Sequence, residues 1–263
     1  MGNLHGFDPA RNSVDPDKMT LVDRWILECL NEVVTECRRA YDAYEFRRVF
    51  TLINQFCARE LSAIYVDLTK DRLYCDATDL MERRACRTVM NEVYERLTAW
   101  LAPILAFTAE EAWQARVQDI ENSVHLRSYD PIPDSWLDPA LGERWAVIRQ
   151  VRQVVTTALE AARNDGSIGA SLQAAPVVHV DAAGAKLFAG EDAAALFITS
   201  DAQITTDAAP VDAFRVEGIE KVAVAFAMAD GGKCARCWKI MPEVTSEDDI
   251  CNRCDDVVNA AAG

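Results

Sequence analysis

Histidine is scarce in this sequence, and the motifs of common nucleotide-binding and hydrolytic enzymes are missing. His5, His125 and His179 lie far apart in the sequence, and none stands with cysteines or carboxylates at metal-ligand spacing. There is no GxxxxGK(S/T) phosphate loop, and Gly166-Ser-Ile-Gly169 follows a predicted helix rather than a strand, unlike a dinucleotide-binding fingerprint. The residues alone therefore indicate no catalytic centre in this chain.

Long apolar runs and positive charge are lacking too. No stretch of about 18 apolar residues is present, so we expect no membrane contact. The chain has 27 basic and 42 acidic residues, a net charge of -15, which argues against nonspecific nucleic-acid binding but leaves room for a local basic patch. The first residues have neither the basic flank nor the apolar run of a secretory signal, and nine cysteines without a signal predict the reducing cytoplasm.

Apolar periodicity predicts a mainly α protein that opens with an antiparallel helix bundle, residues 1–137. Apolar residues recur in steps of three and four over 22–37, 46–64 and 86–104, which is typical of amphipathic helices. The second stripe includes Phe46 and Phe50, which we expect in the core. Capping boxes at Thr20-Leu-Val-Asp23 and Thr108-Ala-Glu-Glu111 predict helix starts. Residues 117–140 interrupt the pattern with three prolines and predict a linker.

A second domain is predicted over residues 138–230 and a zinc-binding segment over 231–263. Asp138-Pro139 has the residues of a helix start, and that helix should end near Gly166. Beyond it, strands are expected at 177–180, 197–198, 211–216 and 222–226, and short helices at 182–187 and 193–196. The sequence therefore predicts a long helix, a small α+β unit and a C-terminal zinc ribbon or knuckle.

The strongest chemical signal is a pair of CxxC motifs. Cys234 and Cys237 are followed, after thirteen residues, by Cys251 and Cys254. Four thiolates close a tetrahedral shell, which suits one structural Zn²⁺ and leaves no open position for catalysis. A disulfide pair, unrelated thiols or an iron site are the alternatives.

The other cysteines are not expected to react. Four of them fall on or beside the apolar stripes, where a free cysteine behaves as a small apolar residue, and Cys75 lies in a polar segment that suggests exposure. Those on the stripes are Cys29, Cys37, Cys57 and Cys86.

Cations and an aromatic residue surround the CxxC pair and suggest a nucleotide-binding surface. Cations bind phosphate and an exposed ring stacks on an unpaired base. The residues concerned are Lys233, Arg236, Trp238, Lys239 and Arg253. The alternative is that Trp238 packs under the knuckle and the cations are solvated. In the bundle, Lys70 and Arg72 belong to a group of basic residues that either contacts RNA or forms a charged solvent face.

Several segments together resemble the C-terminal half of bacterial isoleucyl-tRNA synthetases, and the resemblance covers nearly the whole chain. The matching segments are Gly2-Asn-Leu-His-Gly-Phe-Asp-Pro9, Glu60-Leu-Ser-Ala-Ile-Tyr-Val-Asp67, Lys70-Asp-Arg-Leu-Tyr74, Ala102-Pro-Ile-Leu-Ala-Phe-Thr-Ala-Glu-Glu-Ala-Trp113, Ile168-Gly-Ala-Ser-Leu-Gln-Ala174 and Lys233-Cys-Ala-Arg-Cys-Trp238. The helical part would also suit the valyl or leucyl enzymes, and the terminal CxxCW…CxxC points to the isoleucyl branch.

This resemblance implies a class I synthetase that joins isoleucine to tRNA(Ile) with ATP. It implies that the bundle binds the anticodon arm, that Cys234, Cys237, Cys251 and Cys254 hold Zn²⁺, and that the zinc segment supports tRNA recognition. The family's HIGH-type and KMSKS-type adenylation signatures and its editing domain are not in this sequence. We therefore expect a monomeric, excised fragment that binds tRNA(Ile) and is inactive alone, because the ATP-binding half is missing. The tail after Cys254 is short compared with the family. A helical, zinc-containing protein–protein adaptor is the alternative function.

Overall fold

The chain forms two compact units, which are described separately. The structure is a computed structural model and describes residues 2–262. The first unit takes in the residues up to Leu73 together with Ala77–Pro139, and the second takes in Tyr74–Asp76 and the chain from Ala140. The division falls two residues beyond the predicted boundary at 137/138. The further separation of 138–230 from 231–263 stays a prediction.

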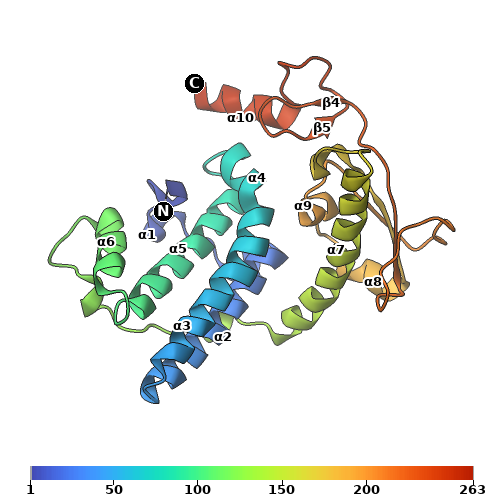
Figure 1. The fold of residues 1–263 in the computed structure, drawn as a ribbon. Coiled ribbons are helices and arrows are strands. Elements are labelled where there is room, and N and C mark those ends of the chain that lie inside the picture. Colours follow the sequence, from blue (N-terminus) through green and yellow to red (C-terminus); the bar gives the residue numbers. More distant parts are fainter. Residues whose placement is uncertain (1, 263) are drawn as a thin grey trace. The chain divides into compact units, whose positions relative to one another are not determined.

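The first unit is a helical bundle (Figure 1). Its longer helices lie close together, since α2 packs against α3, η3 and α5, and α5 packs against α6. η3 is a π-helix that continues α3 into α4 without a break. Among the short elements of this unit, α1 is an α-helix and the others are 3-10 turns. The bounds are η1 Gly2–Leu4, α1 Pro9–Asn12, η2 Pro16–Lys18, α2 Leu21–Asp42, α3 Phe46–Gln55, η3 Phe56–Val66, α4 Asp67–Cys75, α5 Met81–Leu101, α6 Ala106–Val117, η4 Val124–Leu126 and η5 Asp134–Trp136.

Helix α2 shows how the sequence determines this part of the fold. Thr20 and Asp23 form the predicted capping box, in which each side chain accepts from the other residue's backbone amide. The apolar stripe that follows is buried, with Ile26, Leu27 and Leu30 fully excluded from solvent. The expectation of an amphipathic helix here is confirmed.

Two predictions about the bundle are wrong. Helix α6 begins at Ala106, and its N-cap is Leu105 without a side-chain cap, so the Thr108–Glu111 capping box does not form. In α3 only one row of the apolar stripe, Val49 and Ile53, is buried, whereas Phe46 and Phe50 are exposed. Consecutive residues on a helix point about 100° apart, so a contact that buries Val49 can leave Phe50 in solvent.

The second unit combines the long helix α7 with a small sheet (Figure 1). Helix α7 starts at Pro139 and ends at Asn164, as predicted. The sheet has the order β2-β1-β3, in which β1 runs parallel to β2 and antiparallel to β3. A two-stranded ladder, β4 with β5, leads to α10. The bounds are α7 Pro139–Asn164, η6 Ser171–Gln173, β1 Val177–Val180, α8 Ala182–Leu187, α9 Ala193–Phe197, β2 Gln203–Thr205, β3 Val222–Ala225, β4 Gly232–Lys233, β5 Ile240–Met241 and α10 Asn252–Ala262.

The strand predictions for this unit are partly wrong. Strands are confirmed at 177–180 and, less one residue, at 222–226, and the two short helices are confirmed as α8 and α9. Residues 197–198 instead end α9, where Ile198 takes a left-handed conformation that closes the helix. Residues 211–216 contribute only an isolated bridge between Phe214 and Val224.

Candidate metal and nucleic-acid site

The four predicted cysteine ligands come together in the second unit. Their sulfur atoms all lie within 4.8 Å of one another, and all four residues are buried. The Sγ atoms of Cys237 and Cys251 are 3.7 Å apart, far beyond the roughly 2.05 Å of a disulfide bond. A tetrahedral ion with metal–sulfur bonds of about 2.3 Å separates its ligands by about 3.8 Å. The spacing therefore fits a single metal ion bound by four sulfurs.

A tight backbone turn aims these sulfurs. The backbone amides of Cys237 and Cys251 point at the Cys234 sulfur, at 3.5 and 3.3 Å. Trp238 donates its amide to the Cys234 carbonyl at 3.0 Å, and Cys234 donates to the carbonyl of Lys239 at 2.9 Å. Each CxxC pair thus shares one local turn, and the second pair is placed by the start of α10.

Two glycines allow the knuckle to close. A Cβ atom at Gly231, whose φ is +113°, would lie 2.1 Å from the Met241 carbonyl oxygen, and one at Gly232 would lie 2.4 Å from that of Val244. Any side chain at these positions would collide with backbone, so β4 and the chain after β5 approach closely only with glycine there.

The electrostatics of the sulfurs also favour a bound cation. Burial alone would raise the pKa of the Cys234 thiol, but hydrogen bonds from the amides of Cys237, Cys251 and Arg236 outweigh it and lower that pKa to about 6. Burial raises the pKa values of Cys237 and Cys251. Holding Cys237 and Cys251 as thiolates at neutral pH therefore requires a positive charge beside them, which a metal ion would supply.

Arg236 and Arg253 are engaged within the second unit. Arg236 donates to the Cys254 sulfur at 3.4 Å and to the carbonyl of Cys75 at 2.6 Å. Arg253 lies 3.2 Å from the carboxylate of Asp76. Cys75 is buried and packs with the four cysteines, so its expected exposure is wrong: a polar local sequence does not reveal a distant packing partner. Arg236 thus contacts a predicted ligand sulfur, and RNA contact by either arginine stays a prediction.

Trp238 and Lys233 remain open to a ligand. Trp238 is 60% exposed, which excludes the alternative that it packs under the knuckle. Its φ of +68° lies in the left-handed region, where a non-glycine residue costs roughly 1–2 kcal/mol. The Lys233 ammonium lies 5.6 Å from the ring centroid. An open cavity of about 660 Å³ lies beside the ring, lined also by Ala235, Thr245, Ser246 and Glu247.

Lys239 is half-buried and no ion pair involves it among residues 2–262. In the bundle, the exposed Lys70 pairs with Asp67 at 2.8 Å. Arg72 instead lies inside, 2.9 Å from the fully buried carboxylate of Asp23. RNA binding by Arg72 stays a prediction, and it would require the guanidinium to leave that carboxylate.

Sequence reasoning missed this buried polar network. Besides Arg72, the Asp23 carboxylate accepts hydrogen bonds from the hydroxyls of Tyr65 at 2.7 Å and Thr20 at 2.6 Å. The residues come from α2, η3 and α4, and only the Thr20–Asp23 pair left a local signal in the sequence. The network fixes the mutual placement of these helices.

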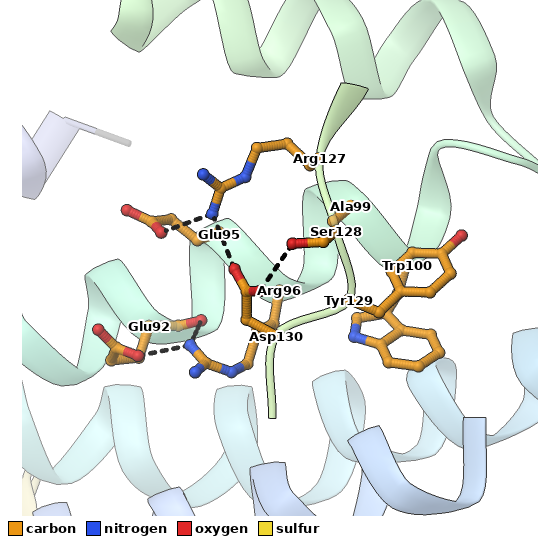
Figure 2. Close-up of a pocket in the computed structure, with 9 residues that line it drawn as sticks. All are labelled: Glu92, Glu95, Arg96, Ala99, Trp100, Arg127, Ser128, Tyr129 and Asp130. Carbon is orange, nitrogen blue, oxygen red and sulfur yellow. Dashed lines mark hydrogen bonds and ion pairs between the residues drawn. The ribbon is translucent and has the colours of Figure 1, made fainter. Parts of the chain in front are cut away.

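A small polar pocket in the bundle is shown in Figure 2. Its volume is about 80 Å³, room for two or three water molecules rather than a base. Arg127 reaches Glu95 at 3.2 Å and Asp130 at 3.6 Å, and Arg96 pairs with Glu92. Both arginines of its wall are thus paired with carboxylates of the same wall, and the pocket is no candidate for a nucleotide.

Comparison with known proteins agrees with this geometry. Residues 23–179 match the family model of the anticodon-binding domain of tRNA ligases, and the chain belongs to this family. It is 45% identical over 97% of its length to an isoleucine–tRNA ligase of Ruegeria pomeroyi, 41% over 99% to one of Gluconobacter oxydans, and 36% over 99% to one of Natranaerobius thermophilus. These alignments cover 26, 26 and 29% of the relatives, so the chain spans about a quarter of their length.

None of the helices between residues 2 and 262 has the length and apolar character that crossing a membrane requires.

Proposed function

We propose that this chain is the tRNA-binding part of an isoleucine–tRNA ligase and binds the anticodon arm of tRNA(Ile). The observation that carries the proposal is the similarity of nearly the whole chain to isoleucine–tRNA ligases, together with the anticodon-binding family match. The whole enzyme would attach isoleucine to tRNA(Ile) with ATP, using residues outside this chain. The fragment itself would supply binding and no chemical step, and we expect it to be a cytoplasmic monomer.

Trp238 is the proposed stacking residue of the zinc segment. Its ring is exposed, its backbone amide donates a hydrogen bond to the Cys234 carbonyl, and Lys233 places a positive charge beside it. An unpaired base stacks on such a ring, and a neighbouring cation binds the adjacent phosphate. Since the overall charge of -15 opposes RNA, selectivity has to come from local contacts of this kind.

Cys234, Cys237, Cys251 and Cys254 would hold Zn²⁺, which when bound crosslinks the two CxxC turns. Four protein ligands leave no coordination position for substrate, so the role of the ion is structural. Elemental analysis of protein purified without added metal should find about one zinc per chain. Protein without any bound metal and with a disulfide among these residues would contradict this assignment.

The test of the proposal is binding of labelled tRNA(Ile) and of the same tRNA with a swapped anticodon. We expect the fragment to prefer tRNA(Ile), and Trp238→Ala to weaken that binding by roughly 5- to 150-fold, with zinc content and helicity unchanged. Equal binding of both tRNAs would overturn anticodon recognition. If Trp238→Ala lost zinc while keeping its affinity, Trp238 would be a packing residue.

A second test concerns catalysis. Isoleucine-dependent exchange of pyrophosphate into ATP should stay at background for the purified fragment, because the chain has no recognisable nucleotide-phosphate motif. Robust exchange would show that the domain content has been misread. The adaptor alternative would be supported by stable binding to a protein partner without any affinity for tRNA.

A further inference from the structure

Three exposed aromatic residues mark the turn between α2 and α3, here called the α2–α3 corner: Tyr44, Phe46 and Phe50. Their exposed fractions are 80, 49 and 54%. Phe46 and Phe50 are four residues apart on α3 and so share one face of that helix. Clustered apolar side chains that stay in solvent mark a binding surface more often than scattered ones.

Tyr44 has an exposed ring and a left-handed backbone conformation. Its φ of +58° lies in the left-handed region that favours glycine. The turn is closed by hydrogen bonds from the amides of Tyr44 and Glu45 to the carbonyls of Tyr41 and Ala40, at 3.0 and 2.7 Å. Trp238 is likewise aromatic, exposed and left-handed. Tyr44 thus ends α2 in a left-handed helix cap, as Ile198 ends α9, and its ring stays in solvent.

The corner rests on a rigid aromatic stack. Phe46 meets Tyr41 edge-on at 5.9 Å between centroids, and Tyr41 stacks on Trp100 at 5.7 Å. Trp100 in turn stacks on Tyr129, with 4.3 Å between the ring centroids. Figure 2 draws both side chains. Because Trp100 is buried, the stack fixes the exposed ring of Phe46 before any ligand arrives, which lowers the entropic cost of binding.

The charge around the corner suits RNA. Residues 36–60 contain five arginines and four acidic residues, so this segment carries a slight positive charge in a chain whose net charge is -15. Arg48 pairs with Glu36 at 2.7 Å and Glu45 at 3.3 Å. By contrast, Arg47 is exposed and makes no ion pair within the described chain. A cation that is not committed internally is available to a phosphate.

A hydrogen-bonding group completes the surface. Asn54 is exposed, lies four residues beyond Phe50 on α3, and its side chain has no hydrogen-bond partner among residues 2–262. Rings, an uncommitted cation and a free amide on one helix face match the needs of an unpaired nucleotide, which offers a π face, a phosphate and base edges.

We propose that the α2–α3 corner is a stacking site for an unpaired RNA base, with Arg47 at the adjacent phosphate and Asn54 at a base edge. The proposal rests on the proposed function in that the RNA would be an unpaired loop nucleotide of tRNA(Ile). It adds to Trp238 a second stacking site, in the other unit of the chain.

The test uses the full chain with its metal and the double variant Tyr44→Gly/Phe50→Ala. Glycine suits the left-handed turn, so the variant should fold. Affinity for labelled tRNA(Ile) at fixed salt should fall by roughly 5- to 150-fold, the range for loss of one stacked base. Phe107→Ala is the matched control, since Phe107 is 93% exposed on α6 of the same unit. It should bind tRNA(Ile) like the unmutated chain.

Arg47→Gln should reduce the slope of log affinity against log salt by about 0.7 to 1.

Each outcome decides between the proposals. If the double variant binds both tRNA(Ile) and the anticodon-swapped tRNA like the unmutated chain, the stacking site is overturned while the proposed function stands. If the unmutated chain does not distinguish the two tRNAs but the double variant weakens both, the stacking site stands and anticodon recognition falls. If the double variant changes only the sedimentation behaviour of the protein, the corner is a protein interface and the stacking site is overturned.

Discussion

The bundle and the zinc segment differ in what stabilises each of them internally. The bundle buries a broad set of large apolar side chains, among them Ile26, Leu30 and Val49, and adds the buried pair Asp23–Arg72. The buried cluster of the zinc segment consists of Cys75, Val244 and the four ligand cysteines. An extended apolar core can fold by itself, whereas so small a cluster needs a crosslink. The comparison leads us to expect a part that folds by itself and a part that depends on a metal ion within one chain.

The largest effect is expected from removing the metal. Structural zinc contributes an apparent binding free energy of about 10–16 kcal/mol, so chelation should unfold residues 232–262 and leave the bundle helical. Amide hydrogen exchange should show the loss of protection confined to that segment. Cys251→Ser should behave like chelation, and Cys57→Ser, outside the metal group, should keep its zinc. A segment that stays protected after the metal is gone would remove the distinction between the two parts.

The next effect concerns the buried ion pair of the bundle. Arg72→Met leaves the fully buried Asp23 carboxylate without its cation, so the free energy of unfolding should fall by about 3–5 kcal/mol. Denaturant unfolding followed by circular dichroism measures this loss. Lys70→Met is the matched control on the same helix: its pair with Asp67 is exposed and should be worth less than about 1 kcal/mol. Equal losses in the two variants would mean that burial does not set the strength of these pairs.

These two effects also show where sequence reasoning reaches its limit. The capping box at Thr20, the start of α7 at Pro139 and the four-cysteine group follow from residues close together in the sequence, and all three are confirmed. The ion pair between Asp23 and Arg72 joins residues 49 positions apart in the sequence, and no local sequence motif indicates such a pair. The exposure of Phe46 was missed for a similar reason, because periodicity gives the apolar rows of a helix but not which row meets a neighbour.

The third effect separates strain from binding at Trp238. Trp238→Gly should relieve the left-handed strain, so the zinc segment should be as stable as before or more stable by about 1 kcal/mol. The same variant should lose roughly 5- to 150-fold in tRNA(Ile) affinity, because no ring is left to stack. Thermal melting and tRNA titration on one preparation give both values. A clear loss of stability would show that the ring supports the fold instead.

The smallest effect is an alkaline loss of bundle stability. Burial and the nearby Asp23 carboxylate raise the pKa of Tyr65 well above 10 in the folded chain. As the pH rises, the Tyr65 hydroxyl therefore loses its proton in the unfolded chain before it does so in the folded chain. The stability contributed by Tyr65 is therefore complete below about pH 10 and is lost above it, by about 1.4 kcal/mol per pH unit.

The pH profile of unfolding for Tyr65→Phe is the comparison for this effect. Other tyrosines also titrate in this range, so the quantity of interest is the difference between the two profiles. The unmutated chain should lose stability more steeply above pH 10 than the variant does. Parallel profiles would mean that Tyr65 does not couple the bundle to pH.

The central claim, that this chain binds the anticodon arm of tRNA(Ile), is tested most directly by hydroxyl-radical footprinting of tRNA(Ile) on the unmutated, zinc-loaded protein. The account predicts protection confined to the anticodon stem and loop, with loop protection reduced in Trp238→Ala and in Tyr44→Gly/Phe50→Ala. Protection of the acceptor arm without the anticodon arm, or no protection at protein concentrations that saturate binding, would contradict it.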